Sequence, residues 1–506
     1  MEKLEAAVSA AEFISYDEEM TGIGFAGVSF QEFNAYSDKP FERYEKMRKV
    51  ATAFGIVQLG VTAWVREGGK LVASPFNIFV FPGGDGDDIL VSPGAVKFLS
   101  EHGMDWREWL DKGVPFVDAG REEEKRVALT RAGDLEFCDR QLARCKALEK
   151  GSIQLDPQPN PLVRRYLYQE IERRFPGLGV EKLAGFRIGV TKLTPADRAR
   201  RLKDIERCRA ERLGARRVFL SLSEACRRGV PLVGHNCWFD LLFMMRSFDG
   251  PLPASYAEWK RRCRALFPLL YDTKVLAARR GAYGKLDELY AKVLAEDKKN
   301  IEIICFANGF DKYSPEREDG EEGPLLPFGE FHEAGWDSFV TGVVFVHFRD
   351  NTRGENRLNN MRSPYQISLE PKATLVDEYL DPLSWDPAAN VFHVSGLDTP
   401  DDAPLHFTTV HHHAFHGNNE WLVDADDVKS LPAAAAAGNG NHRPLVAVTP
   451  FDLFAKQQAL DSAKRQHPDI DTSGWWAWLR TKLAAIHILS DPTASPPRKR
   501  HCPSSS

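Results

Sequence analysis

The sequence predicts an α/β protein with more than one domain. Its 506 residues are enough for two to four domains of roughly 100–200 residues each. A hydrophobic content of 43% supports packed cores. Segments of strand character come first and segments of helical character follow them, which is the order expected of a layered α/β fold.

Three segments near the N-terminus have the apolar, β-branched composition of strands. They are residues 12–17, Ile56–Val61 and Phe76–Phe81. The sequence Glu67-Gly68-Gly69-Lys70 predicts a hairpin turn between the last two, because consecutive glycines mark turns. We expect helices to follow at Pro93–Leu110 and Glu122–Glu149.

The segment from Asn160 to Arg217 has a different, more charged character. An amphipathic helix starts at Leu162–Tyr168, a short strand is expected near Phe186–Val190, and a charged helix covers Asp197–Arg217. That last stretch has nine Arg and Lys against four Asp and Glu, a net charge of +5. Two interpretations stay open, a solvated helix face and a basic surface that faces RNA.

The remaining elements are predicted in the second half of the chain. They are a strand at Val230–Val233, helices at Phe239–Met245, Gly281–Leu294 and Phe339–Phe348, a linker over Asn351–Asp386, and a strand at Val391–Val394. Poly-alanine and Gly-Asn sequence at Pro432–Asn441 predicts a loop. The basic run at Pro496–His501 is consistent with nuclear import.

Composition narrows the functional classes. A net charge of −6 and a pI near 6.2 argue against nucleic-acid binding by bulk charge, so an RNA site has to be a local basic patch or a metal-lined pocket. Eight cysteines without a Cys-x-x-Cys pair favour a reducing compartment over a disulfide frame or a zinc site. The start of the chain lacks a signal-peptide pattern. The apolar stretch Trp475–Leu489, interrupted by Arg480 and Lys482, falls short of the ~20 residues of a membrane span. We therefore expect a soluble intracellular protein without a membrane partner.

Asp17 and Glu19 form the first candidate pair for chemistry. On a strand, alternate residues share one face, so the two carboxylates project together. Burial of such a pair costs several kcal/mol per charge unless a positive group neutralises it. Oxygen ligands suit Mg²⁺ or Mn²⁺. The alternative is a surface strand with solvated acids.

Asp240 lies in the otherwise apolar run from Cys237 to Met245. A lone carboxylate in a buried helix needs a partner, and a metal ion supplies one. The preceding Gly234-His235-Asn236 predicts a strand-to-helix turn that directs this side chain toward a cleft. The alternative is a helix-capping or salt-bridged aspartate.

His332 and Asp337 complete the candidate set. Gly335 between them predicts a helix start whose first turn presents Asp337, with His332 in the loop before it. An imidazole has a pKa suited to accepting a proton from water near neutral pH. The alternative is a helix-capping histidine beside an ordinary acid.

The order Asp-x-Glu, Asp, then His-x4-Asp resembles the DEDD exonucleases of the histidine subtype, which have a ribonuclease-H-like fold with a mixed sheet. The flanking sequences resemble the poly(A)-specific ribonuclease family from about residue 5 to residue 346. The segments that carry this resemblance are Met20-Thr21-Gly22-Ile23, Val57-Gln58-Leu59-Gly60, Phe79-Val80-Phe81-Pro82, Gly234-His235-Asn236, Phe267-Pro268, Asp272-Thr273-Lys274 and His332-Glu333-Ala334-Gly335-Trp336-Asp337.

The resemblance implies a Mg²⁺-dependent 3′-to-5′ exoribonuclease that shortens poly(A) tails of mRNA and releases 5′-AMP. Two Mg²⁺ ions, for which Mn²⁺ substitutes, would be held by Asp17, Glu19, Asp240 and Asp337. His332 would be the general base. Substrate contacts would come from Met20, Ile23, Phe98 and Lys274. The implied partners are RNA with a free 3′ hydroxyl and a second copy of the chain, and the implied location is the nucleus and the cytoplasm.

The resemblance also implies a domain layout. A nuclease core in two parts, 1–151 and 216–348, flanks an inserted small nucleic-acid-binding domain at 152–215. A linker at 349–387, an RNA-recognition-motif-like (RRM-like) α+β module at 388–490 and a basic disordered tail at 491–506 follow. Two other functions stay open. One is 3′-end trimming of small noncoding RNAs by the same chemistry, and the other is an inactive RNA-binding scaffold.

Overall fold

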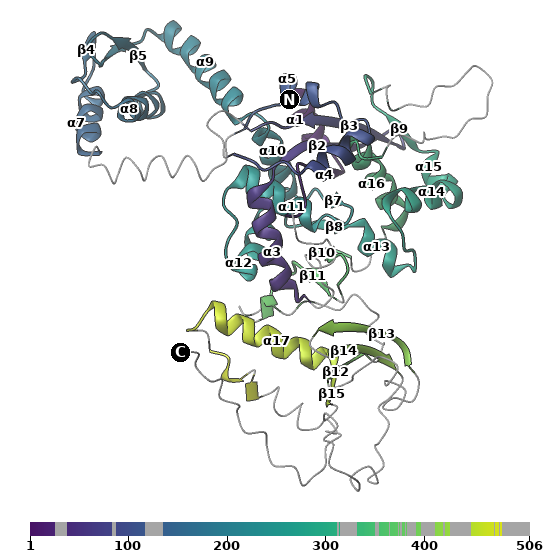
Figure 1. Ribbon diagram of the computed structural model, residues 1–506. Coiled ribbons are helices and arrows are strands. Elements are labelled where there is room, and N and C mark those ends of the chain that lie inside the picture. The colour runs from purple at the N-terminus through teal and green to yellow at the C-terminus, as the bar shows by residue number, and fades with distance from the viewer. Residues whose placement is uncertain are drawn as a thin grey trace, which may run out of the picture. The chain divides into compact units, whose positions relative to one another are not determined.

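The computed structural model divides the chain into two compact units, which are described separately (Figure 1). The first unit comprises residues 1–25, 48–252 and 266–352, and the second comprises 26–47, 253–265 and 353–506. The structure describes residues 1–25, 38–82, 88–116, 135–310, 313, 331–349, 354–363, 365–372, 374, 377–379, 381, 391–395, 410–417, 420–425, 447–469, 471–474 and 476–477.

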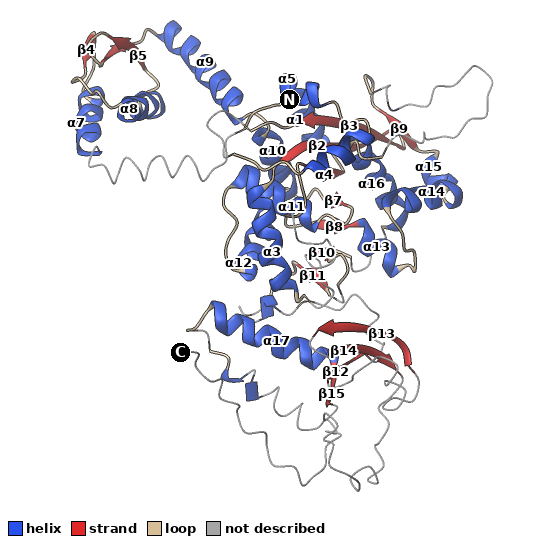
Figure 2. Cartoon of the chain, in the orientation of Figure 1, coloured by secondary structure: helices blue, strands red, loops and turns tan. Residues whose placement is uncertain are grey.

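A six-stranded mixed sheet forms the centre of the first unit, in the order β8-β7-β1-β2-β3-β9 (Figure 2). Strands β1, β2 and β3 are antiparallel, and β7, β8 and β9 join the sheet in parallel. The strands are β1 (Phe13–Met20), β2 (Ile56–Glu67), β3 (Lys70–Phe79), β7 (Leu232–Gly234), β8 (Leu270–Asp272) and β9 (Ile304–Phe306). The prediction of an α/β fold with a mixed sheet is confirmed.

The predicted hairpin between β2 and β3 is present. Glu67 pairs with Lys70, so only Gly68 and Gly69 form the turn. Both glycines have positive φ, 54° and 84°, which is the requirement of the two-residue turn that matches strand twist. The three predicted N-terminal strands are confirmed, and each extends past one of its predicted ends. Strands β1 and β2 end later than predicted, and β3 begins earlier.

Helix α16 (Ala334–Phe348) packs on one face of β1 and β2 and carries much of the core. Its Phe339 stacks on Trp64, and Trp64 stacks in turn on Phe13. A Cβ at Gly342 would lie 2.3 Å from the Trp64 indole, so the helix can approach the strand this closely only with glycine there. The predicted helical segment Phe339–Phe348 is confirmed and begins five residues earlier.

The other helices of this unit surround the sheet. They are α1 (Glu2–Ala10), α4 (Pro93–Glu101), α5 (Trp106–Lys112), α10 (Arg216–Arg227), α11 (Trp238–Met244), the π-helix Met245–Asp249, α13 (Thr273–Arg279), α14 (Leu286–Glu296) and α15 (Lys298–Ile301). The single helix predicted at Pro93–Leu110 is wrong. Gly103 has a φ of 80°, and Asp105 accepts the Glu108 N–H to start α5, so two helices form.

The segment predicted as an inserted domain has its own sheet, β4-β6-β5, and its own core. Its elements are α7 (Leu135–Lys146), β4 (Ser152–Gln154), α8 (Pro161–Arg174), β5 (Leu178–Leu183), β6 (Arg187–Lys192) and α9 (Pro195–Leu213). Helix α7 contributes Cys138 and Leu142 to this core, so the packed segment begins upstream of the predicted boundary at 152. The predicted helix Asp197–Arg217 ends at Leu213, because Gly214 adopts a positive φ of 49°.

The second unit contains a four-stranded antiparallel sheet in the order β13-β14-β12-β15, with helix α17 next in the chain. Its elements are the first part of α3 (Pro40–Ala53), most of α12 (Tyr256–Leu266), β10 (Arg357–Asn359), β11 (Gln366–Ser368), the 3₁₀ helix Asp377–Tyr379, β12 (Val391–Ser395), β13 (Val410–Gly417), β14 (Glu420–Ala425), β15 (Ala447–Pro450) and α17 (Phe451–Gln466). The strand predicted at Val391–Val394 is confirmed, and the RRM-like assignment stays a prediction.

The linker predicted at 349–387 is wrong for its described part, which is folded. Strands β10 and β11 pair, and Leu358 and Ile367 are fully buried. Two acidic residues of this polar segment pair with basic residues of α12. Asp381 accepts from Lys260 at 2.9 Å, and Glu378 from Arg264 at 2.7 Å.

Some predictions fall outside the described residues. These are the start of the helix at 122–149, the loop at 432–441 and the tail at 491–506. Within the part of the chain that the structure describes, no helix has both the length and the apolar character needed to cross a bilayer.

Candidate active site

Strand β1 presents Asp17 and Glu19 on the face that α16 covers. Asp17 lies opposite Gly60 of β2, and Glu19 lies opposite Gln58. A Cβ at Gly60 would lie 1.8 Å from the carbonyl oxygen of Ala334, so α16 begins directly on this strand. Gln58 Oε1 accepts the Ala334 N–H at 3.1 Å and fixes the start of the helix beside the two carboxylates.

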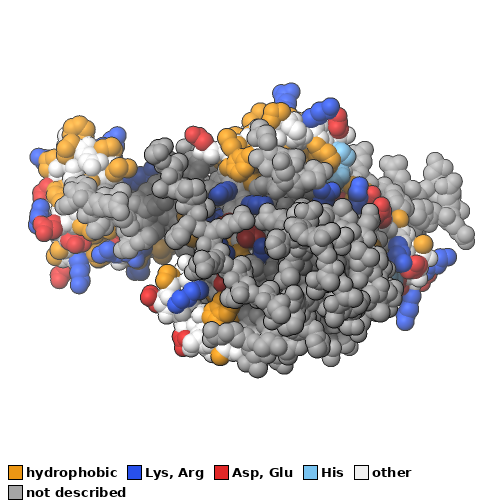
Figure 3. All heavy atoms as spheres, turned by 60° about the horizontal axis from the view of Figure 1, so that its bottom comes forward, with side chains coloured by type: hydrophobic (Ala, Val, Ile, Leu, Met, Phe, Trp, Pro, Cys, Tyr) orange, Lys and Arg blue, Asp and Glu red, His pale blue; other side chains and the backbone are white. Residues whose placement is uncertain are grey.

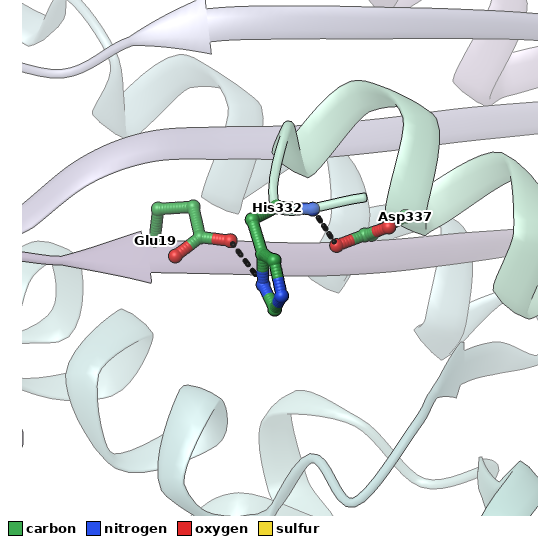
Figure 4. Close-up of side chains that lie close together, drawn as sticks. All are labelled: Glu19, His332 and Asp337. Atoms are coloured by element: carbon green, nitrogen blue, oxygen red, sulfur yellow. Dashed lines mark hydrogen bonds and ion pairs between the residues drawn. The ribbon is translucent and has the colours of Figure 1, made fainter. Parts of the chain in front are cut away.

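The start of α16 brings His332 and Asp337 to Glu19, as Figure 4 shows. One ligand atom from each of these three side chains lies within 4.8 Å of the others. His332 Nδ1 is 3.9 Å from Glu19 Oε1, and the His332 backbone N–H donates to Asp337 Oδ2 at 2.9 Å. Asp337 Oδ1 is buried and has no hydrogen-bond partner among the described residues. His332 therefore sits between two acids from distant segments.

Asp240 reaches the same region because β7 runs parallel to β1, with Val233 paired to Ser15. The turn after β7 is held by Asp272, which is fully buried. One oxygen of Asp272 accepts the backbone N–H of Asn236 at 2.8 Å and that of Lys274 at 3.0 Å. Asn236 has a φ of 54°, a conformation that asparagine tolerates. The predicted strand-to-helix turn is confirmed, and it places Asp240 in the first turn of α11.

His235 strengthens this turn by a side-chain hydrogen bond. Its Nδ1 lies 2.8 Å from Thr273 Oγ1. Burial, with a smaller contribution from the charge of Lys274, lowers the pKa of His235 to about 3, so the ring is neutral. The sequence marked His235, Asp272 and Thr273 only as parts of motifs. The hydrogen bonds of these residues support the turn that positions Asp240.

All four carboxylates have a raised pKa, and burial is the largest cause for each. Burial, followed by the charges of Asp337 and Asp240, raises the pKa of both Asp17 and Glu19. Burial raises the pKa of Asp240 to about 7 and that of Asp337 to about 7. Among the described residues, no lysine or arginine forms an ion pair with any of the four, and the ion pair recorded there is with His332. Buried acids without a cationic partner are the donor set that fits divalent metal ions.

Glu18 is a buried acid that sequence reasoning missed. Its side chain projects from the opposite face of β1 and is 4% exposed, and neither carboxylate oxygen has a hydrogen-bond partner in the described structure. Burial, followed by the charge of Asp240, raises its pKa. Ile14 and Tyr16 are buried on the same face of the strand, so the two-residue period could have identified it.

The ring of His332 is bordered by groups from two further helices. Phe98 and His102 of the α4 end lie 4.7 Å and 4.4 Å from it between ring centroids. Burial, followed by the charges of His102 and Lys285 against that of Asp287, lowers the pKa of His332. A histidine with a lowered pKa is mostly neutral at pH 7 and can accept a proton.

The predicted substrate contacts occupy different positions. Met20 ends β1 and is half-buried, Lys274 is half-buried in the first turn of α13, and Ile23 and Phe98 are 46% and 41% exposed. Thr21 anchors the Met20–Ile23 segment, since its hydroxyl donates to the Leu90 carbonyl and accepts from the Gly55 N–H. Of the four, the structure brings Phe98 into ring contact with His332. Their contacts with RNA stay predictions.

The charges on the described surface match the composition. Basic and acidic side chains are both visible among the described residues on the face shown in Figure 3.

Fold and site together define an α/β protein with a mixed sheet and a cluster of carboxylates beside a histidine. The model of the CAF1 family ribonucleases matches residues 1–345, and the chain belongs to this family. It is therefore a ribonuclease, and the predicted resemblance to the poly(A)-specific ribonucleases is confirmed.

Similar proteins include the human poly(A)-specific ribonuclease PARN, which is 24% identical over 464 residues that cover 81% of this chain and 68% of that protein. The pre-piRNA 3′-exonuclease trimmer of Bombyx mori is 25% identical and covers 68% of each chain. Among solved structures, S. pombe Pop2p in its Mg²⁺- and Mn²⁺-bound form is 14% identical, with a TM-score of 0.35, over 71% of this chain and 94% of that one.

Proposed function

We propose that this ribonuclease is a divalent-metal-dependent 3′-to-5′ exoribonuclease that removes adenylate residues from poly(A) and releases 5′-AMP. The observation that carries the proposal is the convergence of four acids from three distant segments, without an Arg or Lys ion pair in the described structure. The names of the relatives, a poly(A)-specific ribonuclease and a pre-piRNA 3′-exonuclease, support the 3′-exonucleolytic direction and the RNA substrate.

In this proposal Asp17, Glu19, Asp240 and Asp337 hold two Mg²⁺ ions, with Mn²⁺ as a substitute. The Asp337 Oδ1, which has no hydrogen-bond partner among the described residues, and the raised pKa values of the acids support this assignment. Bound divalent ions lower the pKa of water and neutralise charge that develops on the phosphoryl oxygens. The fold of the chain holds the four carboxylates close together in the absence of the ions.

His332 is the proposed general base. Its lowered pKa keeps the ring neutral at pH 7, so it can take the proton of the attacking water. Nδ1 lies 3.9 Å from Glu19 Oε1, which is longer than an ordinary hydrogen bond. In this proposal Nδ1 accepts the proton. The hydrogen bond from the His332 backbone N–H to Asp337 holds the loop that carries His332 next to the Asp337 carboxylate.

The substrate enters with a free 3′ hydroxyl in this proposal. The exposed apolar side chains of Ile23 and Phe98 are suited to pack against the terminal bases, and Met20 and Lys274 are half-buried. A methionine at position 20 does not provide an aromatic stacking contact, which is worth ~1–3 kcal/mol per base. We infer a moderate preference for adenine. A homodimer, RNA binding by the inserted and C-terminal modules, and a nuclear and cytoplasmic location belong to the same proposal.

A second candidate function is 3′-end trimming of small noncoding RNAs. The similarity to the pre-piRNA trimmer favours it, since this chain covers the same share of that protein as of human PARN. The chemistry of the site is the same for both substrates, so only the RNA preference distinguishes the two functions.

The test uses the full chain and three RNAs of equal length, namely oligo(A), oligo(U) and a structured small-RNA precursor. Each is offered with a free or a blocked 3′ end, in Mg²⁺ or EDTA. We expect stepwise release of 5′-AMP from unblocked oligo(A) in Mg²⁺ alone. Faster trimming of the precursor would establish the second candidate, and cleavage of blocked RNA would contradict exonucleolysis from the 3′ end.

A further inference from the structure

Among the described residues, none forms an ordinary hydrogen bond with the His332 imidazole that would fix its orientation. Its side chain is 41% exposed, and its recorded polar neighbour, Glu19 Oε1, is 3.9 Å away. Its backbone has a φ of 74°, which is strained for a residue other than glycine. The Asp337 contact holds the backbone N–H and leaves χ1 and χ2 of the ring undetermined. Something else has to orient the ring if it is to accept a proton.

Two rings from the end of α4 pack against His332. The His102 ring meets it edge-to-face at 4.4 Å and 76°, and the Phe98 ring meets it edge-to-face at 4.7 Å and 71°. Phe98 and His102 contact one another at 4.3 Å. Edge-to-face contacts at such separations are attractive beyond the area that they bury. The three rings thus form one cluster with His332 on the side of the acids.

His102 is itself fixed in place. Its Nδ1 lies 2.7 Å from the Phe98 carbonyl oxygen, which only accepts, so Nδ1 carries the proton. The His102 and Met104 backbone N–H groups both donate to the Leu99 carbonyl, and Gly103 closes the helix with a φ of 80°. The His102 ring is therefore held in one orientation beside His332.

We propose that His102 is a positioning residue that holds the His332 ring with Nδ1 directed at Glu19. The proposal rests on the proposed function, because it assigns His102 a part in the same hydrolysis. The contribution comes from the shape of the ring, since the edge of His102 fills the space into which the His332 ring would otherwise rotate. His102 acts through His332 and touches neither the acids nor the reacting phosphate.

The test compares His102→Ala and His102→Phe with the control Glu101→Ala, which changes an exposed neighbour on the same helix end. Steady-state AMP release from oligo(A) is measured at saturating Mg²⁺. Misplacement of a catalytic group costs up to about a hundredfold in rate. We expect kcat of His102→Ala to fall by about tenfold to a hundredfold while KM stays within about twofold. His102→Phe should retain most of the kcat, and Glu101→Ala should equal the wild type.

A second measurement follows the His332 ring protons by NMR in the metal-free protein. Ring currents from His102 should displace these resonances, so they should move in His102→Ala and stay in Glu101→Ala. Unchanged kcat or unmoved resonances in His102→Ala would overturn the positioning role. A raised KM at constant kcat would mean that His102 contacts RNA instead, and failure of His102→Phe to restore kcat would exclude a role of ring shape. An inactive wild type would refute the proposed function itself.

Discussion

Buried and half-buried acids occur in two parts of this protein, and they differ in the residues that pair with them. In the described part of the second unit, three acids have basic partners, namely Asp38 with Arg43, Asp381 with Lys260 and Glu378 with Arg264. In the first unit Asp17, Glu19, Asp240 and Asp337 cluster with one another, and no such partner pairs with them among the described residues.

The comparison distinguishes a structural acid from a functional one. A buried ion pair is satisfied within the chain, and loss of either partner leaves a buried charge. A group of buried acids alone is an energetic cost that the fold carries until a cation binds. Burial, against the smaller effect of Asp381, lowers the pKa of Lys260, so even the paired cluster carries a cost of desolvation. The acid cluster of the first unit carries a larger cost of desolvation, which is typical of a functional site.

The largest expected effect is that of Asp240→Asn on activity. Loss of one metal ligand should lower kcat at least about a thousandfold, or roughly 4 kcal/mol in the barrier. The same change should raise the melting temperature of the metal-free protein, because a repelling buried charge is removed. AMP release and thermal unfolding in EDTA check both, with the exposed Asp139→Asn as control. Full activity of Asp240→Asn would contradict a functional role of the acids in the first unit.

Asp381→Asn should lower the stability of the protein, which is the opposite of the effect expected for Asp240→Asn. Lys260 and Asp381 are both fully buried, with side-chain exposures of 0%. Removal of the acid leaves the lysine without its counter-ion, at a cost of about 3–5 kcal/mol in the free energy of unfolding. Denaturant unfolding should show this loss in Mg²⁺ and in EDTA alike. Equal stability of Asp381→Asn and the wild type would show that the paired cluster is not structural.

Gly60→Ala should damage the site by moving a helix. The new Cβ would lie 1.8 Å from the Ala334 carbonyl oxygen, so the start of α16 has to shift away from β2. Overpacking of this kind costs about 1–3 kcal/mol in stability, and displacement of Asp337 should lower kcat by about tenfold or more. Gly177→Ala, where a Cβ meets nothing within 4 Å, is the control. A variant with normal kcat would mean that the acids tolerate a displaced α16.

A further expected effect is a dependence of stability on pH. Asp240 and Asp337 have a pKa of about 7 in the folded protein, against about 3.9 in an unfolded chain. The folded state therefore keeps protons that the unfolded state has lost, and the metal-free protein loses stability as pH rises from about 4 to 7. Added Mg²⁺ should raise the melting temperature more at pH 8 than at pH 5. An equal rise at both values would show that the ions bind elsewhere.

The sequence alone predicted the parts of the site that follow local rules. Alternation along a strand placed Asp17 and Glu19 on one face, and Gly335 located the start of α16 and the place of Asp337. The sequence Gly234-His235-Asn236 predicted the turn before Asp240. These signals span a few residues each, and the structure agrees with them.

The remaining features depend on contacts between distant segments, which local patterns do not encode. Strands β7, β8 and β9 have three residues each, too few to show a period. The acids of the predicted linker pair with cations more than a hundred residues away, at |i−j| of 121 for Lys260–Asp381. The contact of His102 with His332 likewise joins segments that are far apart in the chain.

The most direct test of the central claim is a calorimetric titration of the metal-free protein with Mn²⁺ at pH 7.5. The account predicts saturable binding of two ions per chain, weakened strongly in Asp240→Asn and Asp337→Asn and unchanged in Asp139→Asn. Absence of saturable binding, or equal binding by all four proteins, would contradict a metal site built from these acids.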